Sequence, residues 1–370
     1  MSFAAESKSV KTTTGKSSTS MAAVNTLDND VKLSLLPRQI KYCSEALKFL
    51  KNKRVYQSEL LDAEFASLPQ RVKVIVNGLE MLEAPHRFSV AYSEKNLNKN
   101  RYTDVVPFDT NLVRLNPCKD YRPSATGYIN ASFLMASPSE NVSQFIAAQG
   151  PLPVHSPHAT QGTILPSQGQ IPDTYEDFWE MVLQHRCPVI VMLTPFADDK
   201  KKKKCGDYFQ TDDGPREFGN ICVTTISTET TPDSLVLRNL EVKYKESEEP
   251  PLSVLHILYL DWPDDGVPKG TLTLRKIWRR LSTVLPIKGP IVVHCSAGIG
   301  RTGAYCTVHN TMQRILIGDM SAWNIGETVK TFRSQRIGMI QTKEQYDYCY
   351  DAVIEELEDI VSEHCGHTSC

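Results

Sequence analysis

Cys295 and Arg301 are the residues whose types and spacing point most directly to chemistry. They stand at the two ends of a glycine-containing segment that follows the apolar run 291–294. Inward-turned amides of such a segment form a nest for an anion, and a helix beginning near Thr302 adds its positive end, so Cys295 is favoured as a thiolate. The guanidinium of Arg301 can bind two phosphoryl oxygens at once. The pattern predicts a nucleophile aimed at phosphorus, with a nest formed by the amides of Ser296, Ala297, Gly298, Ile299 and Gly300.

A dinucleotide-binding turn is the competing interpretation of the same glycines. Gly298, Gly300 and Gly303 match the pattern G-x-G-x-x-G, and Asp319 follows near the position of a ribose-binding carboxylate. The chain ends too soon after Gly303 to hold the rest of such a domain, and a bulky arginine inside the turn would crowd a pyrophosphate. We therefore favour phosphate chemistry.

The passage from His294 to Gly303 resembles the signature loop of the classical, tyrosine-specific protein phosphatases. Several other short motifs agree between about residues 95 and 358, and the soluble plant members are most similar. The resemblance implies hydrolysis of phosphotyrosine in proteins through a phosphocysteine intermediate, with no metal or other cofactor. It implies phosphotyrosine-containing proteins as partners, and the plant forms suggest phosphorylated mitogen-activated kinases among them.

The resemblance also assigns catalytic roles outside this loop. Asp264 lies in a W-P-D motif that starts at Trp262, and it would protonate the leaving phenolate and then activate water. Gln341 would position that water, and Gln345 belongs to the same loop. Thr302 would stabilise the sulfur as a leaving group.

Substrate recognition and support are assigned by the same resemblance. Tyr102 would stack on the substrate ring, and Asp104 would accept hydrogen bonds from the substrate backbone. Together they would form the wall of a deep cleft that the shorter phosphoserine side chain cannot span, which argues against a dual-specificity phosphatase. The other matches are Lys204 beside the acid loop, Tyr208 hydrogen-bonded to His294, Asn130 bracing the cysteine, Arg336 as scaffold, and Gly338 keeping the cleft mouth open.

Three departures from the family pattern bear on activity. Asp265 stands where Phe or His is expected, so a like charge would weaken substrate binding and raise the pKa of Asp264. Residues 154–172 form an insertion. Asp199, just before the five lysines 200–204, replaces a longer Glu that would brace the arginine. A weakly active phosphotyrosine-binding module is therefore the alternative to an enzyme.

Alternating strand-like and helix-like runs supply the elements that must position these residues. They predict an α/β fold with a twisted mixed β-sheet flanked by helices. The expected strands cover 144–148, 188–193, 235–245, 254–260 and 291–294. The expected helices cover 174–184, 271–285, 302–317, 324–334 and 342–360, and a capping box of Thr174 and Asp177 should start the first of them.

Composition bounds the class of protein. The 370 residues include 41 Lys plus Arg and 43 Asp plus Glu, a net charge of −2, which predicts no nucleic-acid or membrane partner. No uncharged apolar run approaches the ~18 residues of a membrane span. Ten scattered cysteines favour a reducing compartment. We expect a cytoplasmic location, and the lysine run leaves a nuclear one open.

We expect one phosphatase domain over 34–360. An amphipathic helix from Pro37, with apolar Ile40, Cys43, Leu47 and Leu50, should cap it. Residues 1–33 are rich in Ser and Thr and predict a disordered tail, with a transit peptide as the alternative. A flexible tail is expected over 361–370. A reactive Cys295 should oxidise readily and condense with the backbone nitrogen of Ser296 to a sulfenamide.

Overall fold

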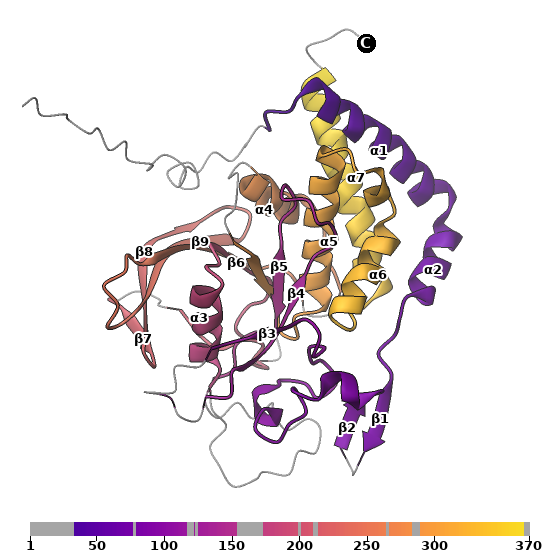
Figure 1. Ribbon diagram of the computed structural model, residues 1–370. Helices are drawn as coiled ribbons and strands as arrows, with labels where there is room; N and C mark the ends of the chain where they lie inside the picture. Colours follow the sequence, from indigo (N-terminus) through magenta and orange to yellow (C-terminus); the bar gives the residue numbers. More distant parts are fainter. Residues whose placement is uncertain are drawn as a thin grey trace, which may run out of the picture.

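The computed structural model describes residues 33–76, 79–116, 122, 125–153, 173–198, 201–209, 214–263, 266–282 and 289–365. In this part of the chain, a large mixed sheet lies between helix α3 on one face and a group of helices on the other (Figure 1). The predicted α/β fold is therefore confirmed. Of the predicted tail 1–33 only Leu33 is described, and the insertion 154–172 and residues 366–370 lie outside the described residues.

The elements span the whole of the described chain. The helices are α1 (Pro37–Tyr56), α2 (Ser58–Ser67), α3 (Tyr175–Gln184), α4 (Leu272–Ser282), α5 (Gly300–Leu316), α6 (Ile325–Gln335) and α7 (Lys343–Cys365), with 3-10 turns η2 (Pro85–Phe88), η3 (Leu97–Lys99) and η5 (Met320–Trp323). The strands are β1 (Lys73–Val76), β2 (Leu79–Leu82), β3 (Leu112–Arg114), β4 (Tyr128–Leu134), β5 (Phe145–Ala148), β6 (Val189–Met192), β7 (Arg216–Phe218), β8 (Ile221–Thr230), β9 (Leu235–Tyr244), β10 (Leu252–Tyr259) and β11 (Ile291–His294).

The main sheet has parallel strands at its centre and antiparallel strands at its flanks. Its order within the described residues is β3-β4-β5-β11-β6-β10-β9-β8-β7. Strand β11 pairs in parallel with both neighbours, so that Ile291 is level with Phe145 and with Val189. The carboxyl ends of parallel strands meet at one edge, and such an edge is where α/β proteins place their ligands.

Two hydrophobic cores cover the two faces of the sheet. Strand β11 shows the alternation directly, since Ile291 and Val293 belong to the core shared with α4–α7, and Val292 belongs to the core shared with α3. All three side chains are fully buried. A strand buried on both faces reads as a continuous apolar run, which is why the sequence predicts it well.

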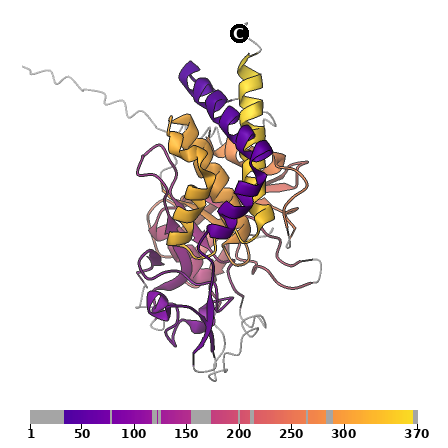
Figure 2. The same cartoon turned by 90° about the vertical axis from the view of Figure 1, so that its right-hand side faces the viewer.

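The amino-terminal helices form a layer outside the helical group. Helix α1 packs along α7 and α5 and buries Cys43, Ala46 and Leu50 (Figure 2). The Arg54 guanidinium donates two hydrogen bonds, of 2.8 and 3.0 Å, to the carboxylate of Asp351 on α7. The predicted helix from Pro37 is confirmed, and α2 extends this layer.

The predicted strands and helices are all present within the described residues, with ends shifted by a few positions. Helix α7 continues to Cys365 instead of ending at residue 360, so residues 361–365 are helical and not part of a flexible tail as predicted. The elements that we did not predict from the sequence are β1, β2, β3, β4, β7, β8 and α2. Strand β8 shows why: much of it is polar and exposed, so it has no apolar run.

The predicted capping box at the start of α3 is wrong. The hydroxyl of Thr174 accepts a hydrogen bond from the Leu152 amide at 2.9 Å and caps no amide of its own helix. Asp177 is buried and forms ion pairs with Lys99, at 2.8 Å, and with Arg122. A buried carboxylate needs such partners, and this need outweighs local capping.

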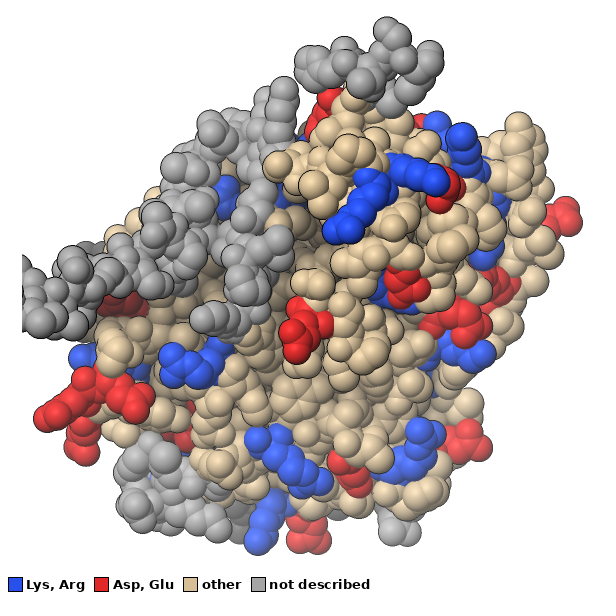
Figure 3. Space-filling view, turned by 45° about the horizontal axis from the view of Figure 1, so that its top comes forward, with Lys and Arg blue, Asp and Glu red and all other residues tan. Residues whose placement is uncertain are grey.

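Charges of both signs are interspersed on the face of the molecule shown in Figure 3, among broad neutral areas. Across the described residues, no helix combines the length and the apolar character needed to cross a membrane.

Candidate active site

The segment between β11 and α5, which we call the cysteine loop (residues 295–300), carries the predicted nucleophile. Its tight path depends on Gly298, which has φ +73°. A Cβ atom there would lie 2.1 Å from the carbonyl oxygen of Ala148, so the loop passes against the end of β5. Only glycine fits both the left-handed backbone and the close approach.

Cys295 lines a cavity, and the surroundings of its sulfur favour the ionised form. The amide of Gly298 donates to Sγ at 3.3 Å. Burial alone would raise the pKa of this thiol, but the charge of Arg301, the hydroxyl and amide of Thr302 and the amide of Gly298 together lower it below its usual value. The Thr302 hydroxyl makes no well-aligned hydrogen bond within the described residues, so Arg301 and the amides are better placed to stabilise the thiolate.

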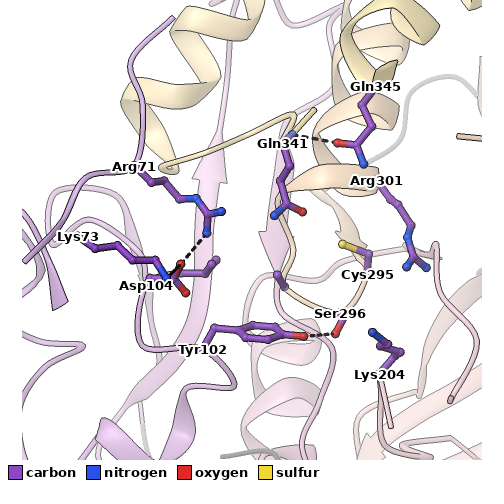
Figure 4. Close-up of a pocket in the computed structure, with 12 residues that line it drawn as sticks. Arg71, Lys73, Tyr102, Asp104, Lys204, Cys295, Ser296, Arg301, Gln341 and Gln345 are labelled. Atoms are coloured by element: carbon purple, nitrogen blue, oxygen red, sulfur yellow. Dashed lines mark hydrogen bonds and ion pairs between the residues drawn. The ribbon is translucent and has the colours of Figure 1, made fainter. Parts of the chain in front are cut away.

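Arg301 lies in the first turn of α5 and lines the same cavity (Figure 4). Its Nη1 donates to the carbonyl oxygen of Leu193, just beyond the end of β6, at 3.0 Å. This bond joins the arginine to the central sheet and limits the positions its guanidinium can take. The structure thus brings together Cys295 and Arg301, as their spacing predicts.

The cavity has a volume of about 360 Å³, which matches a small ligand such as a phosphorylated phenol. One wall is Tyr102, whose hydroxyl shares a hydrogen bond of 3.0 Å with that of Ser296. The lining residues are Arg71, Lys73, Tyr102, Asp104, Val105, Lys204, Cys295, Ser296, Ala297, Arg301, Gln341 and Gln345.

The two glutamines predicted from the family pattern lie over the start of α5. Gln345 accepts a hydrogen bond from the amide of Gln341 at 2.9 Å. A Cβ at Gly300 would lie 2.5 Å from Oε1 of Gln341. The side chains of both glutamines therefore reach the cysteine loop, where Figure 4 shows Gln341 pointing into the cavity.

Comparison with known proteins decides the family. The family model described as protein-tyrosine phosphatase matches residues 96–355, which is more than half of the chain. The chain belongs to the protein-tyrosine phosphatase family. This confirms the predicted enzyme class and agrees with the resemblance on which the site residues were assigned.

Several relatives of this phosphatase are similar over most of its length. It is 52% identical over 331 residues to Protein-tyrosine-phosphatase PTP1 of Arabidopsis thaliana, covering 90% of this chain and 89% of that protein. It is 35% identical over 284 residues to Tyrosine-protein phosphatase non-receptor type 20 of Rattus norvegicus, covering 77% of this chain and 60% of that protein. It is 32% identical over 311 residues to Receptor-type tyrosine-protein phosphatase C of Homo sapiens, covering 84% of this chain and 21% of that protein.

Arg336 holds the cysteine loop of the phosphatase in place from behind. Its buried guanidinium donates to the carbonyl oxygens of Gly298, at 2.8 Å, and of Ala297, at 3.1 Å. It also donates to Oδ1 of Asn130 at 2.8 Å. Asn130 thus reaches the loop through Arg336, whose part in this brace the sequence did not reveal. Burial lowers the pKa of Arg336 to about 10, so it stays charged at neutral pH.

Asp104 has partners that the sequence did not indicate. Its Oδ2 accepts from Nη1 of Arg71 at 3.1 Å and lies 3.2 Å from Nζ of Lys73. Both cations line the cavity (Figure 4). Neither belongs to a motif around Asp104, and only the fold brings them to it. Gly338, with φ +76°, lies against the side chain of Arg71, because a Cβ there would lie 2.7 Å from Cδ of that arginine.

Three further predicted residues have the following surroundings. Lys204 lines the cavity, with its Nζ 3.3 Å from Oδ2 of Asp198. The hydroxyl of Tyr208 lies 2.6 Å from Nε2 of His294, as the resemblance implies. Burial lowers the pKa of His294 to about 4, so its ring is neutral.

The predicted acid loop is described only at its two ends. The ring of Trp262 is buried, with its centroid 5.5 Å from that of Tyr348 on α7, and its N–H donates to the carbonyl of Gly266 at 3.4 Å. Asp264, Asp265 and Asp199 lie outside the described residues.

Proposed function

We propose that this phosphatase hydrolyses phosphotyrosine in proteins in two steps, through a phosphocysteine intermediate. The thiolate of Cys295 attacks phosphorus while the bond to the phenolic oxygen breaks, and Asp264 gives its proton to that oxygen. Water then loses a proton to the Asp264 carboxylate and attacks phosphorus, which releases the thiolate. The products are the dephosphorylated tyrosine and inorganic phosphate.

The position of the Cys295 sulfur carries this proposal. Cys295 lines a cavity of about 360 Å³ together with Arg301, in surroundings that lower the pKa of its thiol. A thiolate held next to a fixed guanidinium and inward amides is suited to attack a phosphoryl dianion, whose oxygens those donors bind. The alternative for a buried cysteine is inert packing, and Cys306 illustrates it, since burial raises the pKa of that thiol well above its usual value.

The second step is assigned to residues around the same sulfur. Gln341 points into the cavity and is suited to orient water, because an amide does not compete for the proton of that water. Thr302 would stabilise the departing thiolate through its hydroxyl and amide. The role of Asp264 rests on the W-P-D motif alone.

Selectivity for tyrosine is proposed to follow from the walls of the cavity. Tyr102 flanks the cysteine loop and would stack on the substrate ring. Asp104, already oriented by Arg71 and Lys73, would accept hydrogen bonds from the substrate backbone. Phosphoserine is too short to reach the sulfur while its backbone stays at Asp104.

The biological setting is proposed from the family resemblance alone. The resemblance to plant members of the family is the reason to propose phosphorylated mitogen-activated kinases as substrates, and thus a role in signal transduction. A cytoplasmic location is proposed, with a nuclear one open.

The test is turnover of matched phosphotyrosine and phosphoserine peptides by the natural chain and by Cys295→Ser. Release of phosphate from phosphotyrosine only, abolished by the substitution, supports the proposal. Binding of phosphotyrosine by both chains without turnover would favour a phosphotyrosine-binding module, for which Asp265 gives a reason. Equal turnover of the two peptides would contradict the assigned walls.

A further inference from the structure

The hydroxyl of Tyr208 lies between two buried histidines. It is 2.6 Å from Nε2 of His294, at the end of β11, and 2.9 Å from Nε2 of His256, on β10. All three side chains are fully buried. The contact to His294 follows from the family pattern, whereas His256 has no assigned role.

The direction of these hydrogen bonds can be worked out from the number of protons. A tyrosine hydroxyl donates one proton, so it cannot donate to both histidines. The sulfur of Met192, 3.8 Å away, is only a weak acceptor and does not compete. Burial lowers the pKa of both histidines, so each neutral ring carries one N–H. One histidine must therefore donate to Tyr208, and the other must accept from it.

The surroundings of His256 identify the donor. Its Nδ1 is buried and has no hydrogen-bond partner within the described residues. An unprotonated Nδ1 without a partner is tolerated there more readily than an unpaired Nδ1–H, because unpaired buried N–H groups are rare. The positive charge of Arg238, directly opposite His256 on β9, also favours the neutral ring. The proton of His256 accordingly lies on Nε2 and is donated to Tyr208.

The rest of the chain of bonds then follows. Tyr208 donates to Nε2 of His294, so the proton of His294 lies on Nδ1, which is 3.3 Å from the carbonyl oxygen of Cys295. The opposite direction would bring the lone pair of Nδ1 against that oxygen, and the two would repel. We propose that His256 is a positioning residue that fixes the direction of the bonds from His256 through Tyr208 and His294 to the backbone of Cys295. The proposal rests on the proposed function only in taking Cys295 as the nucleophile.

The first test reads the tautomers directly. Long-range proton–nitrogen NMR spectra of the intact chain, labelled with ¹⁵N at histidine, separate the two neutral forms. Signals are assigned by their loss in His256→Gln and in His294→Gln. We expect the proton on Nε2 of His256 and on Nδ1 of His294. A proton on Nδ1 of His256, or on Nε2 of His294, would overturn the proposal.

The second test asks whether the chain of bonds acts on the sulfur. The pH dependence of iodoacetamide alkylation at Cys295 gives its thiol pKa. His256→Leu removes the donor, and we expect the pKa to rise by about 0.3–0.5 units, because bonds in a chain strengthen one another modestly. The amide nitrogen of Gln can replace Nε2–H, so His256→Gln should stay close to the natural value.

A matched control separates this effect from lost packing. His309 is also fully buried and shares a hydrogen bond of 3.0 Å with a tyrosine hydroxyl, that of Tyr305, outside this chain of bonds. His309→Leu should lower the melting temperature without moving the thiol pKa of Cys295. If His256→Leu behaves in the same way, His256 only fills space and the proposal fails. Neither test uses turnover, so an inactive protein would refute the proposed function and leave this result standing.

Discussion

A methyl group at position 298 tests whether the shape of the cysteine loop sets the reactivity of its sulfur. In Gly298→Ala the backbone at position 298 would have to keep φ +73°. The new Cβ would then lie 2.1 Å from the carbonyl oxygen of Ala148. That neighbour is backbone at the end of β5, so it cannot turn aside as a side chain could. The loop must move, and the Gly298 amide that donates to Sγ of Cys295 moves with it.

The expected size of the effect follows from that one bond. A hydrogen bond to a charged group contributes about 1.5–3 kcal/mol, and one pKa unit corresponds to about 1.4 kcal/mol. Loss of the amide should raise the thiol pKa of Cys295 by about 1–2 units. The acid limb of the pH–rate profile should move to higher pH with it, since the reaction needs the thiolate. Displacement of the sulfur should also reduce kcat about 100-fold.

The assays are alkylation of Cys295 as a function of pH and the steady-state kinetics of a phosphotyrosine peptide. Gly214→Ala is the matched control, because Gly214 has φ +80° and no described atom lies within 4 Å of its added Cβ. It should lose about 1–2 kcal/mol of stability from backbone strain and keep the natural thiol pKa. A natural thiol pKa and kcat in Gly298→Ala would refute the reasoning, as would equal changes in both variants.

Three other substitutions or treatments test separate parts of the site. Arg336→Lys keeps the charge, but a lysine cannot reach all the acceptors of Arg336. It should lower the free energy of unfolding by about 2–4 kcal/mol, measured by urea unfolding, and kcat about tenfold, measured by steady-state kinetics. An unchanged kcat would show that Arg336 does not support the cysteine loop. Asp265→His removes a like charge beside Asp264, so the pKa of that acid should fall and the alkaline limb of the rate profile should move to lower pH; identical alkaline limbs would reject this. Low doses of peroxide should abolish activity and a thiol should restore it if Cys295 forms a sulfenamide, whereas permanent loss would count against that route.

The sequence predicts the parts of this molecule that are local. The cysteine loop lies in one short segment, so residue type and spacing contain its chemistry. The central strands are buried on both faces and appear as apolar runs, as in 188–193 and 291–294. Helices α5 and α7 are long enough for their periodic patterns to show.

What the sequence could not predict depends on contacts between distant segments. Arg71 meets Asp104 from 33 positions away, and Arg336 meets Asn130 from 206 positions away. No periodicity or motif links such pairs. The capping box failed for the same reason, because Asp177 is paired with Lys99, 78 positions earlier in the chain.

The scattered origin of the site has a consequence for how activity is lost. Tyr102 and Ser296 are 194 positions apart, and Leu193 and Arg301 are 108 apart, yet Tyr102, Ser296 and Arg301 line the same cavity as Cys295. A proteolytic fragment retains both bonds only if it covers residues 102–301. Turnover is therefore a sensitive reporter of cooperative folding: in a urea titration it should disappear together with the near-ultraviolet circular dichroism, with no active remnant at higher concentrations.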